Sequence, residues 1–295
     1  MKKHPLLLGI MVFGVLLSLF VISIWVLSYF SSREESLWGN EKIAIIEIKG
    51  VILDPQPIVE KLIKFRKNEK VKAIVLRIDS PGGGVGPAQE IHAEVKKVQL
   101  EKKVLVSMGS VAASGGYYIA CAADKIIANP GSITGSIGVI VESLNVEDLF
   151  RKLGLRSTVI KSGRHKDIGS PLRKMTPEEK KLLQGVLDSV HDQFIRAVAE
   201  GRKLPLEKVR SLADGRIFSG DQAKTLGLVD DLGNLQDTIA MAAKMAGIKG
   251  EPEVIYPEKK RFSLLDLILQ QTIFKFLDRA GEHFPPQLFF LYTNP

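Results

Sequence analysis

Ser114 lies in a run of small residues that suits an activated nucleophile. The run GSVAASGGYY, residues 109–118, follows the apolar segment 104–106. Small neighbours let the backbone turn sharply from a strand into a helix and leave the hydroxyl uncovered, as a serine nucleophile requires. The following glycines let a substrate carbonyl approach backbone N–H groups, which can stabilise an oxyanion. A tight turn with a helix-capping serine has the same composition, so this run alone leaves both interpretations open.

A second glycine-rich run, DSPGGG at residues 79–84, follows another apolar segment. A phosphate-binding loop is one interpretation, but the pattern G-x-G-x-x-G from Gly82 needs a glycine where Pro87 stands, and no P-loop lysine follows. We therefore expect the run to present a backbone N–H to a reacting carbonyl at the carboxyl end of a strand, where α/β sheets place ligands. A simple turn is the alternative.

A serine nucleophile needs a base, and the histidines leave this choice open. His4 lies beside the N-terminal apolar stretch and His191 lies on a packing helix, whereas His92 follows the glycine run and stays a candidate. His165 and Lys166 are neighbours, so in an extended segment their side chains point to opposite sides. The residues alone do not decide which of the two faces a site, or whether both lie in a solvated loop.

The elements that position these residues predict an α/β fold. Four apolar segments read as strands, at residues 43–48, 73–78, 104–108 and 125–128, and helical stretches separate them. This alternation is typical of a parallel sheet built from βαβ units. We expect further strands at 137–141 and 157–161 and a helix at 146–153. A capping box at residues 176–179 begins a long amphipathic helix that ends near residue 201.

The N-terminus carries 26 consecutive uncharged residues, from Pro5 to Phe30. This stretch is long enough to cross the roughly 30 Å hydrocarbon core of a bilayer. Two lysines precede it, which places the N-terminus in the cytoplasm and the rest of the chain on the other side. A cleaved signal peptide is the alternative, but residues 28–32 lack a small-residue cleavage site. We therefore expect an anchor at 1–30 and a linker at 31–41.

Composition narrows the class of partner. The net charge is +8, but the basic residues are scattered without clustered aromatic residues, which argues against nucleic acid and suits a domain beside anionic lipid. Cys121 is the only cysteine, so an intrachain disulfide and a multi-cysteine metal site are excluded. Apolar runs in residues 251–295 are interrupted by polar residues, which predicts an amphipathic segment for oligomerisation or a membrane surface.

Five motifs in order carry a resemblance to a known family. They are DSPGGG, GSVAASGGYY, ANPGSITGSIGVI, IKSGRHKDIGSP and ADGRIFSGDQAKTLGLVDDLG, spread over about residues 42–248. Together they resemble the signal peptide peptidase A family (S49) of Ser–Lys membrane proteases, in its short single-repeat form. The resemblance implies the superhelix of ββα units shared by Clp proteases and crotonases, with an N-terminal transmembrane helix and a protease domain at 42–250.

The same resemblance implies roles for five residues. Ser114 would be the nucleophile, and Lys166 rather than His165 the general base. The backbone N–H groups of Gly83 and Gly115 would form the oxyanion hole, and Ser136 would hydrogen-bond the lysine amine. No metal or other cofactor is implied. In the family this dyad is assembled across neighbouring protomers, so a homo-oligomer is expected.

A lysine can act as a base only when its surroundings disfavour the ammonium form. Desolvation by apolar side chains does so, and a nearby carboxylate opposes it. We expect Ile137, Val139 and Ile168 to provide apolar walls around Lys166, and Asp167 to point away along an extended segment.

The resulting prediction is a membrane-anchored serine endopeptidase that degrades hydrophobic peptides such as cleaved signal peptides. It would lie in the cell or inner membrane of a bacterium or archaeon, with one span and an extracytoplasmic catalytic domain. Two alternatives stay open: a crotonase-like acyl-CoA enzyme, for which Glu90 is the acidic candidate near the glycine run, and a non-enzymatic membrane scaffold. Labelling of Ser114 by a serine-directed phosphonate distinguishes the protease from the acyl-CoA enzyme, and the scaffold predicts that Ser114→Ala has no effect on peptide turnover.

Overall fold

A computed structural model describes residues 13–14, 16–23, 41–256 and 289–291. The chain divides into two units, residues 1–41 and residues 42–295. In the first unit, residues 13–14 and 16–23 are helical, and most of the predicted anchor and linker lies outside the described residues. Nowhere in the described part of the chain is there a helix with both the length and the apolar character needed to cross a membrane.

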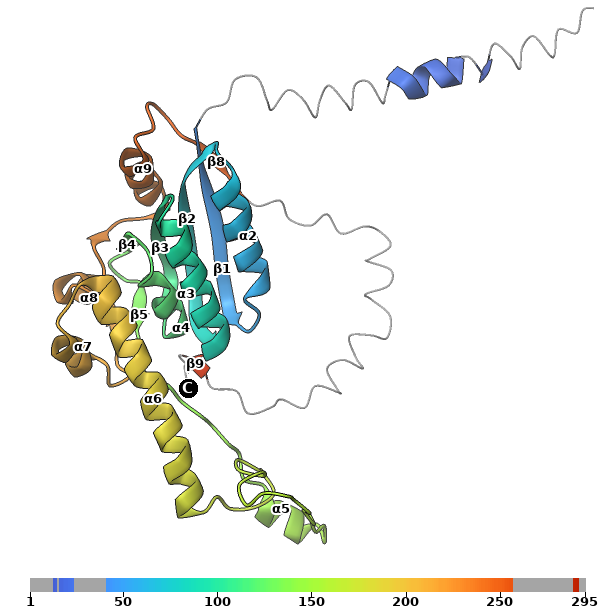
Figure 1. The fold of residues 1–295 in the computed structure, drawn as a ribbon, viewed down its shortest axis with the longest axis vertical. Helices are drawn as coiled ribbons and strands as arrows, with labels where there is room; N and C mark the ends of the chain where they lie inside the picture. The colour runs from blue at the N-terminus through green and yellow to red at the C-terminus, as the bar shows by residue number, and fades with distance from the viewer. Residues whose placement is uncertain (1–12, 15, 24–40, 257–288, 292–295) are drawn as a thin grey trace, which may run out of the picture. The chain divides into compact units, whose positions relative to one another are not determined.

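The second unit is built on a mostly parallel sheet, as predicted. Its central strands are β1 (Lys42–Ile52), β2 (Val71–Gly84) and β3 (Lys103–Ala113), which pair in parallel. The helices α2 (Gln56–Lys67) and α3 (Val85–Gln99) connect them and cover one face, and α9 (Leu235–Ala246) covers the other (Figure 1).

Both faces of the central strands are buried, which explains their continuous apolar sequence. Along β1, Ala44 and Ile46 belong to the core cluster that contains side chains of α2 and α3. The alternate residues, Ile43 and Ile45, belong to the cluster that contains α9. Because successive side chains in a strand point to opposite faces, a doubly covered strand needs apolar residues at every position.

Shorter elements extend the sheet on both sides, in the order β6-β5-β3-β2-β1-β8. The added strands are β4 (Lys125–Ala128), β5 (Ile133–Gly135), β6 (Ile217–Ser219), β7 (Asp231–Leu232) and β8 (Glu253–Ile255). Three short helices accompany them, α4 (Gly115–Ala120), α7 (Leu206–Leu212) and α8 (Gly220–Leu226). The pairing of β5 with β6 is antiparallel.

Two predicted strands are wrong. The strand expected at 137–141 lies earlier, at β5, because the backbone leaves the extended conformation at Ser136, where φ is 49°. The strand expected at 157–161 is absent from the structure, and Ile160 is 97% exposed there. An apolar β-branched run forms a strand only where a neighbouring strand can pair with it. The helix expected at 146–153 is confirmed as α5 (Glu147–Lys152).

The long helix α6 (Pro177–Arg202) begins at the predicted capping box, in which the Thr176 side chain accepts a hydrogen bond from the Glu179 N–H. Its second half is packed into the core through residues such as Val190 and Phe194, whereas its first half is largely exposed. Residues 141–176 and the first half of α6, to residue 189, are called the arm below. The arm extends away from the sheet, with α5 at its far end (Figure 1).

Candidate active site

Ser114 stands at the junction of β3 and α4 in a strained conformation. Its φ and ψ are 52° and −118°, a region that residues with a side chain rarely adopt. Its N–H donates to the Gly135 carbonyl at 2.9 Å, and its carbonyl accepts the Tyr118 N–H at 2.8 Å, which begins the helix. The side chain caps no backbone N–H, and its hydroxyl makes no hydrogen bond with a described residue. The interpretation as a helix-capping serine is therefore wrong.

Ser136 is brought beside Ser114 by the pairing of β3 with β5. Ala113 is opposite Gly135 in the register, so the residues that follow these two, Ser114 and Ser136, are neighbours. Ser136 is also strained, with φ 49°, and its N–H donates to the Arg216 carbonyl at 2.9 Å. Within the described ranges, the third non-glycine residue with a positive φ is Lys203, at the end of α6. Backbone strain is therefore concentrated at this sheet edge.

The glycine run is part of a strand, so its interpretation as a turn is wrong. Strand β2 continues to Gly84, and Gly83 lies opposite Ile52 of β1. A Cβ atom on Gly83 would lie 2.1 Å from the Ile52 carbonyl oxygen, so no other residue fits without a backbone shift. On the other side Ser80 pairs with Ala112 of β3. The glycine run and the Ser114 junction thus lie at the carboxyl ends of adjacent strands.

A strand from the C-terminal segment pairs with the glycine run. The strand β9 (Phe289–Leu291) is antiparallel to β2, with Gly83 opposite Phe290, and it also contacts α3 and α4. Its sequence indicates a segment for oligomerisation or a membrane surface and does not predict this pairing. The short apolar run at 289–292 was the available signal, but a strand of three residues does not reveal its partner. Residues 257–288 and 292–295 lie outside the described part.

Lys166 does not lie beside Ser114 within one chain. It is exposed, and its N–H donates to the Gly163 carbonyl at 3.1 Å within a series of tight turns, not in the expected extended segment. The expected apolar walls are also not assembled around it. Ile137 is buried in the main core and Val139 packs against that core, whereas Ile168 lies in the arm.

The arm sets the separation between this turn and the sheet edge. Arg164 pairs with Glu178 and Arg173 pairs with Glu179, which fixes the Lys166 turn to the first residues of α6. After Glu179, the next buried side chain of α6 is that of Val190, which belongs to the core. About 16 Å of helix therefore separates the residues that hold the Lys166 turn from the core. Within one chain, the structure therefore brings together Ser114, Gly115, Ser136 and the glycine run, and leaves Lys166 apart.

The other candidate residues, His92, His165, Glu90 and Cys121, lie in packing, ion-pair or surface positions. The His92 ring packs against the Tyr118 ring at 4.8 Å between centroids, and burial, assisted by the charge of Lys96, lowers the pKa of His92 to about 4. His165 lies in the arm, with Nε2 3.7 Å from the Glu178 carboxylate. Glu90 is exposed on α3. Cys121 is buried as predicted, which raises the pKa of its thiol to about 12.

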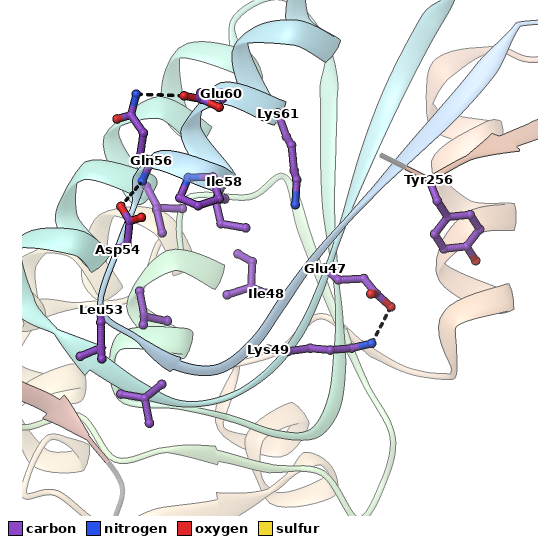
Figure 2. Close-up of a pocket in the computed structure, with 14 residues that line it drawn as sticks. Glu47, Ile48, Lys49, Leu53, Asp54, Gln56, Ile58, Glu60, Lys61 and Tyr256 are labelled. Atoms are coloured by element: carbon purple, nitrogen blue, oxygen red, sulfur yellow. Dashed lines mark hydrogen bonds and ion pairs between the residues drawn. The ribbon is translucent and has the colours of Figure 1, made fainter. Parts of the chain in front are cut away.

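A groove of about 1260 Å³ lies elsewhere, between the end of β1 and the start of α2. Its floor contains Ile48 and Ile58, and the Lys49–Glu47 ion pair of 2.8 Å lies at its rim (Figure 2). None of the five predicted site residues lines it. The groove reaches the candidate site only through Ile52, which lines it and lies opposite Gly83.

Comparison with known proteins decides the family. The sequence profile of Peptidase family S49 matches residues 96–249, more than half of the 295 residues. The chain belongs to peptidase family S49. The Clp protease profile also matches residues 42–133. The S49 match contains Ser114, Gly115, Ser136 and Lys166, and the Clp match contains Gly83.

Two relatives in sequence agree with this S49 assignment. A candidate protease of Synechocystis sp. is 47% identical over 210 residues, which cover 71% of this chain and 76% of that protein. A candidate signal peptide peptidase, SppA, of Enterococcus faecium is 39% identical over 215 residues, or 68% of this chain and 62% of that protein. A variant of ClpP1 from Listeria monocytogenes aligns with TM-score 0.46 and 19% identity, covering 66% of this chain and 93% of that one.

This S49 chain is therefore a serine protease, and the Clp protease-like α/β fold predicted for it is confirmed. The alternatives of an acyl-CoA enzyme and of a non-enzymatic scaffold are wrong.

Proposed function

We propose that the protease is an endopeptidase with a Ser–Lys dyad, in which Ser114 is the nucleophile and Lys166 the general base. The observation that carries the proposal is the strained, uncapped Ser114 at the carboxyl edge of the sheet, between Ser136 and the glycine run. The N–H groups of Gly83 and Gly115 form the oxyanion hole, and Ser136 holds the lysine amine. Strain that serves no capping purpose is typical of a catalytic elbow.

The tail strand supports a peptide as the substrate. Strand β9 lies antiparallel to Gly82–Gly84 and contacts α4, whose N-terminus follows Ser114. An extended substrate can add to the same strand edge, with main-chain hydrogen bonds providing affinity. Its scissile carbonyl then passes close to the oxyanion donors.

The arm supports assembly of the dyad across two protomers. Its large apolar side chains are exposed in the single chain: Leu144, Leu149, Leu153, Leu155, Val159, Ile160, Leu182 and Val186. A monomeric protein rarely exposes such a concentration of apolar surface. A second copy of the chain covers the arm, brings Lys166 to the neighbouring Ser114 and removes the amine from water. Removal from water favours the neutral amine that a base requires.

The reaction then follows an acyl-enzyme course. The neutral Lys166 amine accepts the Ser114 proton as Oγ bonds to the peptide carbonyl carbon, and the oxyanion accepts hydrogen bonds from Gly83 and Gly115. The ammonium returns the proton to the leaving nitrogen as the C–N bond breaks. A water molecule repeats the sequence, losing its proton to Lys166, and releases the carboxylic acid and the free serine.

Hydrophobic peptides such as cleaved signal peptides are the proposed substrates. The Enterococcus faecium relative carries the name of a signal peptide peptidase, and the uncharged stretch 5–30 supports an anchor close to such peptides. In the proposed topology, the chain spans the cell or inner membrane of a bacterium or archaeon once, and its catalytic domain lies on the extracytoplasmic side. Lipid contact is proposed for the anchor and for the segment 251–295.

Turnover of a fluorogenic apolar peptide tests the dyad. Ser114→Ala is expected to remove both turnover and phosphonate labelling, with Ser110→Ala, an exposed serine of the same run, as the matched control. Lys166→Ala is expected to abolish turnover, while His165→Ala is mild. The reverse order for Lys166 and His165, or labelling retained in Ser114→Ala, contradicts the proposal.

A further inference from the structure

The guanidinium group of Arg173 makes the most hydrogen bonds to the turn that carries Lys166 and to the start of α6. Arg173 donates from Nε and Nη2 to the two carboxylate oxygens of Asp167, each at 2.8 Å, and from Nη2 to the Asp167 carbonyl at 3.2 Å. Its Nη1 and Nη2 also donate to the two oxygens of Glu179, at 2.8 and 2.5 Å. Such two-pronged pairing fixes both distance and orientation, which a single ion pair does not. Arg173 therefore joins the residue next to Lys166 to the start of α6.

The Glu179 side chain, to which Arg173 binds, is itself held in place. Its side chain is 4% exposed, and it accepts the Thr176 N–H at 2.9 Å in the capping box of α6. The helix continues without interruption to Phe194 in the core. A continuous series of contacts thus runs from the core along α6, through Glu179 and Arg173, to Asp167 and the Lys166 turn.

The same contacts keep carboxylates away from Lys166. Asp167, its nearest acidic neighbour in the sequence, is shared by Arg173 and Lys161, and Glu178 pairs with Arg164. Lys166 itself makes no ion pair with any residue in the described ranges. The charged and titratable groups that face this turn are Lys161, Arg164, His165, Asp167, Arg173, Glu178 and Glu179.

We propose that Arg173 is a positioning residue of the protease, which anchors the Lys166 turn to α6 and occupies the Asp167 carboxylate so that Lys166 stays unpaired. The inference rests on the proposed role of Lys166 as the base. Without Arg173, the turn loses its anchor and Asp167 is released. A released carboxylate close to the amine favours the ammonium form, which cannot accept the serine proton.

Replacement of Arg173 therefore has two separable consequences. In Arg173→Gln we expect kcat to fall about tenfold with little change in KM, because the loss concerns a group that acts in the transition state. We also expect the rising limb of the pH–rate profile to move to higher pH. Arg173→Lys is expected to recover only part of the loss, since one ammonium cannot pair two-pronged with both carboxylates.

The second mutation separates positioning from charge. Adding Asp167→Asn to Arg173→Gln removes the released carboxylate, so the pH profile is expected to return toward that of the parent while kcat stays low. Asp167→Asn alone is expected to lower kcat without moving the profile to higher pH, which keeps the test usable if Arg173→Gln does not fold. Arg196→Gln, which removes an exposed ion pair of α6 outside the arm, is the matched control and is expected to stay within about twofold.

The results distinguish this inference from the proposed function. If Lys166→Ala keeps full turnover, both are overturned. If Lys166→Ala is inactive while folded, assembled Arg173→Gln retains the parental kcat and pH profile, the role of Arg173 alone is overturned. If kcat falls in Arg173→Gln but the pH–rate profile does not move, the proposed pairing of Arg173 with Asp167 to keep it from Lys166 is overturned. Only the role of Arg173 in anchoring the turn to α6 then stands.

Discussion

The sheet edge and the arm provide the two halves of the proposed dyad in different ways. At the edge, Ser114 and Ser136 are held by paired strands and by backbone hydrogen bonds within a buried core. In the arm, Lys166 stands on a turn that is fixed by ion pairs, and the large apolar side chains of the arm are exposed. The first region is complete in one chain, whereas the second has the composition of an interface.

This difference has a functional meaning. A nucleophile on a strained elbow benefits from a rigid scaffold that is organised before substrate binds. A lysine base must lose water, and an exposed arm reaches that state only when another chain covers it. A monomer would therefore hold a formed nucleophile site without a working base, and assembly would switch on the activity.

The largest effect is expected at a pair of glycines, one in each region. Gly83→Ala places a Cβ 2.1 Å from the Ile52 carbonyl, whereas at Gly163 in the arm nothing lies within 4 Å. Gly83→Ala is expected to lower the free energy of unfolding by about 3 kcal/mol and to abolish turnover, since the oxyanion donor moves. Gly163→Ala is expected to change stability by less than about 0.5 kcal/mol. Urea denaturation and peptide turnover measure both, and equal effects would erase the contrast.

A second comparison concerns exposed apolar residues. Ile160 in the arm is 97% exposed, and Leu100 at the end of α3 is 88% exposed. Ile160→Ser is expected to weaken assembly and to lower turnover about tenfold at dilute concentration, because it removes an apolar contact from the proposed protomer interface. Leu100→Ser is expected to leave both unchanged. Light scattering with parallel assays measures this, and an unaltered oligomer in Ile160→Ser would remove the arm from the interface.

Acid is expected to loosen the arm before the sheet. Hydrogen bonds from Arg173, and then from Lys161, hold the pKa of Asp167 well below its usual value, and those from Arg173 and from the Thr176 N–H lower the pKa of Glu179 to about 2. Since both pKa values are depressed in the folded state, their stabilisation is complete above about pH 5 and is lost as the pH falls below about 4.

Hydrogen exchange follows this loss. Protection factors, corrected for the intrinsic pH dependence, are expected to fall at residues 163–174 between about pH 4 and about pH 2, while those of β2 persist. Asp167→Asn is expected to flatten the change in the arm. Simultaneous loss in both regions would mean that the arm is no weaker than the sheet.

The smallest effect is expected from the tail strand. If β9 occupies the edge on which substrate binds, Phe290→Pro removes an N–H from the antiparallel pair and frees the edge. KM is then expected to fall about two- to threefold with kcat unchanged, because a larger fraction of sites is open. A steady-state comparison with the parent chain measures this. A raised KM would show that the tail helps substrate binding and does not compete with it.

The sequence predicted the parts of the fold that depend on local pattern. Continuous apolar runs indicated β1, β2 and β3 because both faces of these strands are covered, and the capping box located the start of α6. The small residues around Ser114 indicated the strand-to-helix junction. These features are encoded in neighbouring residues.

Features that depend on distant partners were missed. The glycine run was placed at the carboxyl end of a strand, but its pairing with Ile52 of β1 and with the tail strand was not predicted. Val159 and Ile160 read as a strand, but no neighbouring strand pairs with them. Arg173 binds Asp167 and Glu179, each six positions away along the chain, and neither periodicity nor a short motif predicts these contacts.

Mixing two inactive variants tests most directly whether the dyad forms between chains. Ser114→Ala protomers keep Lys166, and Lys166→Ala protomers keep Ser114. After dissociation and joint reassembly in equal amounts, about one quarter of the sites contain both residues if neighbours are drawn at random. Turnover of about a quarter of the parental value is expected in the mixture, and none in either variant alone. A mixture as inactive as its components, although assembled, would contradict formation of the dyad between chains.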